Sequence, residues 1–386
     1  MKLIYLSRYS DSTSSKFSGV DKKIASQVSS LRNLGVDASV LFITENAGAQ
    51  SELPYVRFVI RPESSKSRFR ILTILSRERF FIRSTWEVIH RMKADEILYM
   101  RFSYPFFRWW YCMQKNRSCK IVVEHQALES QSYLMAGNYL YPLFDHIFGG
   151  SIRRHCDGII GVTREITDYE IRRSGDYRKP HITIGNGINV DSIPKKTSSD
   201  LNEGSLHLLC VANVSRWHGL DRVLRGMAEY KGPVKIHLHI VGDGRELPAI
   251  KEMVKAASLE DNVTFYGPLH GRELDELFNR SDIAIGSLAI HRIRMREASI
   301  LKAREYCARG IPFLYGTDDA DFPPGFPYIL RIPPDESPVD IAGVTRFAKT
   351  VYADRDFSVK MREFAEESLD WSVKAQKLKN FLESLP

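Results

Sequence analysis

The chain has 386 residues, which is too long for one compact core and indicates two or three domains. Hydrophobic residues make up 43% and charged residues 26%, a composition that is typical of a folded protein and excludes a largely disordered one. The net charge of +8 is unevenly spread, because residues 61–93 hold nine Lys or Arg against three acids.

Neither a targeting segment nor a disulfide framework is expected. The N-terminus offers only a four-residue apolar stretch before Ser7, which is too short for the core of a signal peptide. No apolar run approaches the roughly 18 residues of a membrane-spanning helix. The five cysteines are scattered without a C-x-x-C pair, which argues against disulfides and a zinc site. We therefore expect a cytoplasmic protein.

The N-terminal half shows strands that alternate with helices. Residues 2–7 read as a short buried strand, and apolar residues at helical spacing predict a helix over 20–34 that ends at Gly35. Further strands are expected at residues 36–43, 96–100, 120–124 and 158–162. Strands separated by helical segments indicate a parallel sheet that is covered on both faces.

A second α/β unit begins after a polar stretch between about residues 186 and 203. Its strands are expected at 206–211, 234–241, 263–266, 283–285 and 311–315, and its helices at 221–229, 246–257, 273–278 and 299–308. The tail, residues 365–385, shows a helical pattern with Trp371 and Phe381 as anchors. We therefore expect domains over residues 1–190 and 191–365, with a ligand in the cleft between them.

The most informative stretch is REASILKAREYCARG, residues 296–310. A helix that begins near Ser299, as its N-cap, places Glu297 on the preceding loop and Glu305 on the second turn. The free N–H groups near Ser299, Ile300 and Leu301 then form a site for a diphosphate, flanked by two carboxylates that can accept hydrogen bonds from sugar and ribose hydroxyls. The alternative is an ordinary charged helix on the protein surface.

With the following IPFLYG, this stretch resembles the donor-site motif of the retaining family 4 glycosyltransferases. The resemblance extends in order along nearly the whole chain, through HCDGIIGV, IGNGINVD, VANVSRWHGL, IVGDGRE and VTFYG. It implies the GT-B fold, in which two Rossmann-like, doubly wound domains face each other across a cleft. Trp371 and Ser372 resemble the start of the final helix, which would carry residues 366–386 back to the first domain.

The resemblance also implies roles for individual residues. Glu305 would bind the ribose hydroxyls, Glu297 a hydroxyl of the transferred sugar, and His125, in VVEHQ, would lie near that sugar. For His125 the alternative is a histidine that caps a helix or loop. The implied catalytic residues are His125 and Glu297, and the implied donor-binding residues are Gly19, Asn213, Arg216, His218, Gly267, Leu269, Ser299, Ile300, Leu301, Lys302 and Glu305. Gly19 would let the backbone approach the phosphates, and Gly267 and Leu269 would line the base pocket with Pro268.

Several positions depart from the family pattern. The family usually offers an Arg and, five residues later, a Lys to the diphosphate, where this chain has Asn213 and His218. A protonated His218 is expected to supply part of the charge, and Arg216 or Arg222 the rest. Ile300 replaces a common Gly and would reshape the sugar pocket. Lys302 could reach the sugar or phosphate, or else face solvent.

The expected reaction is the transfer of a hexose-type sugar from a nucleotide-diphosphate sugar to a hydroxyl, with retention at the anomeric carbon. Helix N-terminal amides and basic side chains would stabilise the leaving diphosphate without a metal or another cofactor. No D-x-D pair is placed to bind a divalent ion, which agrees with this expectation. The acceptor would be a growing glycan or a lipid-linked saccharide, as in polysaccharide biosynthesis.

The basic residues of segment 61–93 alternate with apolar ones, which suits contact with an anionic membrane surface at its cytoplasmic face. The aromatic run FSYPFFRWWY, residues 102–111, suggests the same contact. The alternative for segment 61–93 is a solvated helical face, and the alternative for the aromatic run is the core of the first domain. Two other functions stay open: an isomerase of nucleotide sugars, and a catalytically inactive protein that binds a sugar or a partner. Nucleic-acid binding is not expected, because the basic patch is local and no such motif is visible.

Overall fold

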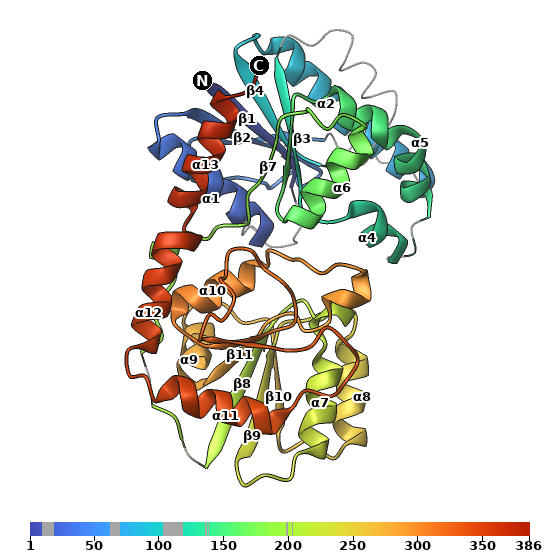
Figure 1. Cartoon of the computed structure of the whole chain (residues 1–386). Helices are drawn as coiled ribbons and strands as arrows, with labels where there is room; N and C mark the ends of the chain where they lie inside the picture. Colours follow the sequence, from blue (N-terminus) through green and yellow to red (C-terminus); the bar gives the residue numbers. More distant parts are fainter. Residues whose placement is uncertain are drawn as a thin grey trace. The chain divides into compact units, whose positions relative to one another are not determined.

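The computed structural model describes residues 1–9, 19–61, 70–102, 119–135, 137, 139–197, 200–202 and 204–386, with only the backbone of residues 70–75. The chain divides into two compact units (Figure 1). Unit 1 comprises Met1–Gly187 and Trp371–Pro386, and unit 2 comprises Ile188–Asp370. The sequence analysis predicted these two boundaries a few residues away, after residues 190 and 365. Each unit contains one parallel sheet with helices, as predicted for the α/β class.

The sheet of unit 1 has seven parallel strands in the order β3-β2-β1-β4-β5-β6-β7. The first strand lies in the middle, with Leu3 opposite Ala38 on one side and Ile97 on the other. The strands are β1 (Lys2–Arg8), β2 (Asp37–Thr44), β3 (Val56–Ile60), β4 (Glu96–Arg101), β5 (Lys120–His125), β6 (Gly158–Gly161) and β7 (His181–Thr183).

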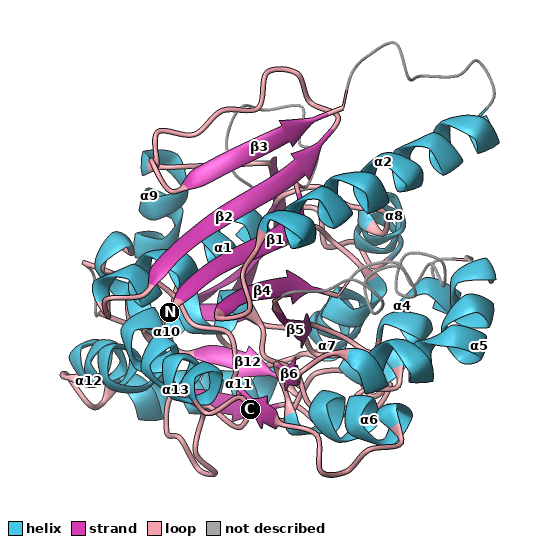
Figure 2. Ribbon diagram, turned by 90° about the horizontal axis from the view of Figure 1, so that it is seen from above, coloured by secondary structure: helices cyan, strands magenta, loops and turns pink. Residues whose placement is uncertain are grey.

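Helices cover both faces of this sheet (Figures 1 and 2). On one face, α1 (Gly19–Asn33) and α13 (Trp371–Glu383) pack against the strands through Ile24, Val28 and Leu378. On the other face, α2, α5 and α6 pack against the strands through Phe81, Tyr141 and Ile171, respectively. The helices of that second face and the short α4 beside it are α2 (Arg70–Arg91), α4 (Glu129–Met135), α5 (Leu140–His155) and α6 (Arg164–Ser174).

The C-terminal helix α13 belongs to unit 1 although the chain enters it from unit 2. Its first residue, Trp371, is buried, and a Cβ atom at Gly187 would lie 2.7 Å from the Trp371 indole ring. Only glycine therefore lets residue 187 pass so close to the helix start. The residues after α13 also bond to the start of β5, since Lys120 donates a hydrogen bond to the carbonyl of Leu385 over 2.9 Å.

The sheet of unit 2 has six parallel strands in the order β10-β9-β8-β11-β12-β13. The strands are β8 (Ser205–Val211), β9 (Lys235–Val241), β10 (Val263–Gly267), β11 (Ile283–Ile285), β12 (Phe313–Tyr315) and β13 (Ile329–Arg331). The helices are α7 (Leu220–Glu229), α8 (Leu247–Ala256), α9 (Arg272–Arg280), α10 (Leu301–Arg309), α11 (Ile341–Tyr352) and α12 (Phe357–Phe364). Short 3-10 turns precede α7 (η3, Arg216–His218) and α10 (η4, Ile290–Ile293).

The strands of unit 2 lie where the apolar runs predict them, with ends that differ by at most two residues. The sequence analysis did not predict β13 or α11. The tail is helical, as predicted: Ala365–Leu369 forms a π-helical turn, and α13 begins at Trp371, where the resemblance places the start of the final helix. The sequence analysis was wrong about the start of α10, which lies at Leu301 rather than Ser299.

Within the part of the chain that the structure describes, no helix combines the length and the apolar character needed to cross a membrane. The four described cysteines, Cys119, Cys156, Cys210 and Cys307, are free and buried.

Candidate functional site

The strand order of unit 2 locates its ligand edge. Counted from the first strand of the unit, the order is 3-2-1-4-5-6, which is the order of a dinucleotide-binding Rossmann sheet. The order reverses between β8 and β11, and ligands of open α/β sheets bind at this switch point, beyond the carboxyl ends of the strands. The loop after β8 carries Asn213, Arg216 and His218, and the loop after β11 leads through Glu297 into α10. The predicted donor residues of these two segments therefore flank the switch point.

The two loops are bonded to each other through the backbone. The N–H of Leu288 donates to the carbonyl of His218 over 3.2 Å, and the N–H of Ala289 donates to that of Trp217 over 3.0 Å. The loop after β9 joins them, because Gly244 lies so close to the backbone of Val214 that a Cβ atom there would collide with it. The conformation of residues 213–218 is therefore determined by both neighbouring loops.

The first turn of α10 is open to an anion. Ile300, not Ser299, is the N-cap residue, and it offers no side-chain cap. Ser299 is buried in the extended segment before the helix, because the backbone of Ala298 pairs with Asp318 (2.9 Å) instead of turning into the helix. The first turn also contains no acidic residue. The first turn of α10 thus has neither a capping side chain from its N-cap residue nor a carboxylate of its own at its positive end.

Glu297 lies on the loop before α10, as predicted, and is half-buried. Its backbone forms an isolated parallel bridge with Asp318, which follows β12. The neighbouring residue is held as well, since the hydroxyl of Thr317 donates to the carbonyl of Arg296 over 2.7 Å. The backbone of residues 296–298 is therefore fixed by the loop that follows β12.

Glu305 lies on the second turn of α10, as predicted, and is half-buried. Nε of Arg309 donates to Oε1 of Glu305 over 2.9 Å, and Nη1 of the same arginine donates to Asp275 over 2.8 Å. Arg309 also lies over the ring of Phe278, 4.0 Å from its centroid. This arginine orients the Glu305 carboxylate, a role that the sequence analysis did not anticipate.

His218 cannot supply the positive charge that the sequence analysis expected of it. The side chain is buried, and Nδ1 accepts a hydrogen bond from the N–H of Ser215 over 3.0 Å. Burial, together with the nearby ammonium of Lys302, lowers the pKa of His218 to about 2. The imidazole is therefore neutral at every physiological pH.

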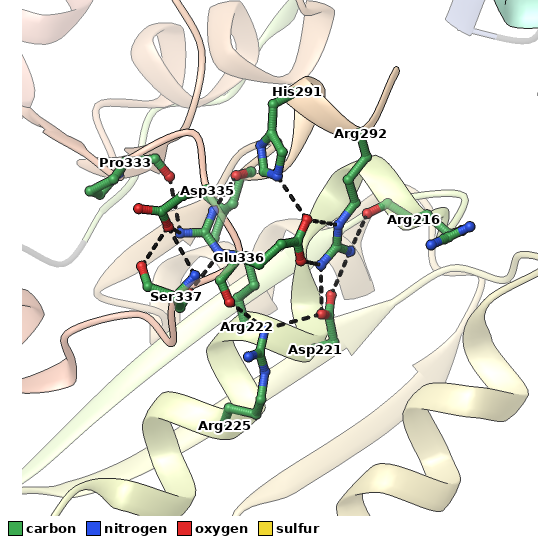
Figure 3. A network of polar contacts seen from close by, with 11 residues as sticks. Arg216, Asp221, Arg222, Arg225, His291, Arg292, Pro333, Asp335, Glu336 and Ser337 are labelled. Atoms are coloured by element: carbon green, nitrogen blue, oxygen red, sulfur yellow. Dashed lines mark hydrogen bonds and ion pairs between the residues drawn. The ribbon is translucent and has the colours of Figure 1, made fainter. Parts of the chain in front are cut away.

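Arg222 is likewise unavailable to a ligand, which contradicts its expected role. It is fully buried, and its guanidinium holds together the loop after β11 and the loop over residues 333–337 (Figure 3). It donates to the carbonyls of Leu288 (2.6 Å), Pro333 (3.0 Å) and Ser337 (2.8 Å) and to the carboxylate of Asp335 (3.1 Å). Arg216, by contrast, is exposed and keeps its place as a candidate ligand of the diphosphate.

Arg292, which the sequence analysis also missed, fixes the backbone at Arg216. Arg292 of η4 donates to the backbone carbonyl of Arg216 over 2.8 Å, and to the carboxylate of Asp221 over 2.9 and 2.7 Å. Figure 3 shows Arg292 between Asp221 and Glu336, with both carboxylates directed at its guanidinium. The carboxylate of Asp221, in the first turn of α7, is thereby neutralised.

Lys302 is not the solvent-facing lysine that the sequence analysis kept as its alternative. It is the second residue of α10, and its Nζ atom is buried without a hydrogen-bond partner among the described residues. Burial lowers the pKa of this ammonium, and the thiol of Cys210 at the end of β8 offsets the shift only in part. Lys302 therefore reaches back from α10 toward the carboxyl end of β8.

The remaining predicted residues of unit 2 lie on the same edge of the sheet. Asn213 is exposed after β8. Gly267 ends β10 with a φ of 67° and open space where a Cβ atom would be, and Leu269 follows it, partly buried. Asp319 and Asp321 form a D-x-D pair after β12, but Arg304 bonds to both carboxylates and balances their charge. Both carboxylates are thus engaged by the guanidinium of Arg304.

Gly19 and His125 belong to unit 1. Gly19 is exposed and begins α1, after residues 10–18, which lie outside the described part of the chain. His125 ends β5 and is fully buried, stacked on the ring of Phe102 at 4.5 Å. Its Nδ1 lies 3.4 Å from Glu129 and 3.5 Å from Glu170.

Among the described residues, His125, Glu129 and Glu170 are the one group whose donor atoms, all within 4.8 Å, could hold a metal ion. Arg153 already bonds to Glu170 and, over 2.7 Å, to Asp145. The Glu170 carboxylate is therefore balanced by a buried guanidinium, which favours a structural network over a metal centre.

Comparison with known proteins finds a family match over part of the chain and a fold over the whole of it. Residues 191–317 match the family described as "Glycosyl transferases group 1". No curated protein matches the chain in sequence. Solved structures resemble the chain over its full length. Their sequence identities to it are low, so this likeness supports a common fold and no more.

Three of these structures have the GT-B fold. Sucrose-phosphate synthase from Thermosynechococcus elongatus has a TM-score of 0.73 at 15% identity, covering 99% of this chain and 98% of that one. Anabaena HepE in complex with UDP and glucose has a TM-score of 0.65 at 14% identity, covering 100% of both chains. Trehalose-6-phosphate synthase OtsA has a TM-score of 0.68 at 12% identity, again covering 100% of both. The predicted GT-B fold and the predicted class, a glycosyltransferase, are confirmed.

Proposed function

We propose that this chain, a glycosyltransferase of the GT-B fold, transfers a hexose-type sugar from a nucleotide-diphosphate donor to a hydroxyl of a growing glycan or lipid-linked saccharide. The observation that carries the proposal is the uncapped start of α10 at the switch point of a Rossmann-ordered sheet, with Glu297 before it and Glu305 on its second turn. Backbone amides at a helix start bind phosphate oxygens, and carboxylates accept hydrogen bonds from hydroxyls. A sugar nucleotide offers both kinds of group.

The donor class has further support. HepE, which shares the fold, is described in complex with UDP and glucose. In this chain the open space at Gly267 and the neighbouring Leu269 suit a base at the end of β10, while Glu305, oriented by Arg309, suits the ribose. Asn213 and Arg216 are exposed toward the same edge and complete the proposed donor site with Ser299, Ile300 and Leu301.

The proposed reaction retains the configuration of the anomeric carbon, as in family 4. The bond from that carbon to the β-phosphate oxygen breaks, and the acceptor oxygen forms the new bond on the same face of the sugar. The acceptor proton passes to the departing phosphate oxygen. Amides of α10 and nearby basic side chains stabilise the charge on the diphosphate, so no metal or other cofactor takes part. Glu297 would hold a sugar hydroxyl, and His125 would lie near that sugar.

We further propose that the enzyme works in the cytoplasm, at an anionic membrane surface. Residues 62–69 of the basic segment, and residues 103–111 of the aromatic run, lie outside the described residues, and Arg61 is buried in an ion pair with Glu45. The described part of the segment, α2, still exposes four arginines against a single exposed acid, Glu87 (Arg77, Arg79, Arg83 and Arg91).

An apolar surface lies on the same side of the unit 1 sheet as these arginines. We call it the α4–α5 patch, and it comprises Leu134, Met135, Tyr139, Leu140, Leu143 and Ile147, each between 44% and 73% exposed. Leu140, Leu143 and Ile147 form one stripe along α5, whose single acid, Asp145, is buried. Helices α2 and α5 pack on the same face of the sheet through Phe81 and Tyr141. Apolar side chains next to arginines are typical of a helix that lies on anionic lipids.

Transfer assays with the purified chain test the enzymatic proposal. A panel of nucleotide-diphosphate sugars is offered with and without glycan acceptors, and released nucleoside diphosphate and product are measured, with the anomeric configuration determined by NMR. Acceptor-dependent release with retention supports the proposal. Turnover of a donor alone into another nucleotide sugar would indicate the isomerase. Donors that raise the melting temperature without any turnover would indicate the inactive binding protein.

A further inference from the structure

The buried ammonium of Lys302 has no counter-charge in the described structure. Its Nζ makes no hydrogen bond to any described residue. The residue nevertheless lies in the first turn of α10, where the helix dipole is positive and disfavours a cation. A lysine placed in this way is unfavourable in the free protein unless an anion joins it.

The groups around Lys302 cannot provide that anion. Cys210 lies at the end of β8, and burial raises the pKa of its thiol, which therefore stays protonated. His218 lies on η3, and burial and Lys302 together keep its imidazole neutral. The titratable groups that act on Lys302 from β8 and η3 thus carry no negative charge.

The neighbouring helix start shows the contrast. In α7, Asp221 lies in the first turn, so a carboxylate of the chain occupies the positive end of that helix. Arg292 then neutralises this carboxylate through two hydrogen bonds. In α10 the first turn contains no acid and no side-chain cap, but it contains Lys302. Of these two helix starts on the switch-point edge, α10 is the one prepared for an external anion.

We infer that Lys302 is a cation that binds the diphosphate of the donor, together with the first amides of α10, and that it supplies the positive charge that Asn213 and His218 cannot. This inference rests on the proposed function, which supplies a nucleoside diphosphate as the ligand. A diphosphate fits better than a single carboxylate, because the pyrophosphate of a Rossmann ligand lies at a helix start beside the switch point. It carries enough charge to meet an ammonium and several amides at once.

The inference has a consequence that a structural lysine would not share. A lysine that forms a needed internal contact stabilises the free protein, so its removal lowers the melting temperature. An unpaired buried lysine destabilises the free protein, so an uncharged side chain of similar length should raise the melting temperature. The same change should weaken diphosphate binding. Stability and affinity therefore move in opposite directions.

The experiment compares the native chain with Lys302→Met, Lys302→Gln and the control Lys255→Met. Lys255 is exposed on α8, and its one ion pair among the described residues is with Glu252, over 3.3 Å, so its removal matches the loss of charge. Calorimetry measures binding of UDP, GDP and inorganic pyrophosphate, and thermal unfolding is followed without ligand. We expect at least tenfold weaker binding in both Lys302 variants, with an equal or higher melting temperature, and an unchanged control.

Two results would overturn the inference while leaving the proposed function intact: binding by Lys302→Met within threefold of the native chain, or a melting temperature several degrees lower in both Lys302 variants. Failure of the native chain to bind any of the three probes would instead reject the proposed function, and with it this inference. Circular dichroism of each variant verifies that the comparison concerns folded protein.

Discussion

Lys302 and His218 interact across the switch-point edge of unit 2, and in this pair the lysine alone can carry a positive charge. Burial and the neighbouring ammonium lower the pKa of His218 to about 2, and burial lowers the pKa of Lys302 as well. The two basic side chains come from different elements, η3 and α10, and the same buried environment disfavours the charged form of each. A bound diphosphate would raise the pKa of Lys302, because a nearby negative charge favours the ammonium.

This relationship predicts how nucleotide affinity depends on pH. The pKa of Lys302 is lowered in the free protein and raised by a diphosphate in the complex, so between these two values the complex holds one proton more. Affinity should therefore be constant below the free-protein pKa and fall by up to tenfold for each pH unit above it. Calorimetric titration with UDP from pH 8 to 10, where the phosphates are almost fully ionised, measures this slope.

The control for the pH experiment is Lys302→Met, whose affinity should be low and independent of pH over the same range. A native chain whose affinity stays constant to pH 10 would contradict the prediction. A His218→Gln variant should keep the native slope, because the His218 imidazole is already neutral throughout.

Glu305→Gln should weaken the use of the donor by about 10- to 100-fold, because a hydrogen bond from a hydroxyl to a charged group contributes about 1.5–3 kcal/mol. The amide has the same size as the carboxylate, and Glu305 is only half-buried on the second turn of α10, so the variant should fold normally. Steady-state kinetics with varied donor provide the measurement. Asp275→Asn is the matched control, because it removes the other carboxylate partner of Arg309. Equal losses in both variants would mean that Glu305 acts only through that arginine.

Arg222→Met should destabilise the protein by about 1–3 kcal/mol, since it leaves the buried carbonyl of Leu288 without its donor. The partly buried hydrogen bonds to the carbonyls of Pro333 and Ser337 are lost as well. Urea unfolding measures the loss. Arg225→Met, on the next turn of α7 and partly exposed, should cost less than about 1 kcal/mol. Native stability in Arg222→Met would contradict the role as a link between the two loops.

The sequence predicts the unit 2 strands well because each is a short apolar run between turn residues, as at residues 283–285. It also places the candidate residues of unit 2 on loops that the structure brings to the switch-point edge. It fails where a distant segment decides the local structure. Ser299 has the chemistry of an N-cap, but pairing of Ala298 with Asp318 keeps it extended.

Side-chain direction is the other feature that the sequence could not provide. Arg216 and Arg222 look equally available, yet Arg222 is buried by the loop over residues 333–337, which lies more than a hundred residues away in the chain. Lys302 looks like a surface residue because the partners that bury its ammonium, Cys210 and His218, come from β8 and η3. A lysine inside an otherwise site-forming motif was the one signal that pointed to it.

The buried pair of Lys23 and Glu124 should be important for the stability of unit 1. Nζ of Lys23 donates to Oε1 of Glu124 over 2.9 Å, and the hydroxyl of Tyr5 donates to the other oxygen. Burial opposes ionisation of Glu124, but Lys23 and Tyr5 outweigh it and lower the pKa. Stability from this carboxylate is therefore present above its unfolded pKa of about 4.3 and is lost as the pH falls through the lower folded value.

Glu124→Gln should cost about 3–5 kcal/mol at pH 7, because it leaves the ammonium of Lys23 buried and unpaired. Urea unfolding at pH 7 and pH 4 measures the difference between the variant and the native chain. That difference should shrink toward acid pH, where the native carboxylate also approaches protonation. A cost below about 1 kcal/mol at pH 7 would contradict the assignment of a paired, ionised carboxylate.

Membrane attachment should depend on the α4–α5 patch. The double variant Leu143→Glu with Ile147→Glu places two carboxylates in the middle of the apolar stripe of α5, where they would have to enter the lipid interface. We expect it to lose most of its sedimentation with vesicles that contain anionic lipid, because each buried charge costs several kcal/mol while the exposed positions tolerate glutamate in solution. Unaltered thermal unfolding without vesicles verifies that tolerance.

The matched control for the membrane experiment is Val359→Glu, which changes an exposed apolar residue of α12 in unit 2. It should sediment like the native chain. The arginines of α2 predict a second dependence, since binding to anionic vesicles should weaken as salt rises from 50 to 500 mM and should be slight on neutral vesicles. Equal sedimentation of the native chain and the double variant at low salt would reject the α4–α5 patch as the attachment site. Absence of sedimentation by the native chain would reject attachment to the membrane altogether, while leaving the transfer reaction to its own assay.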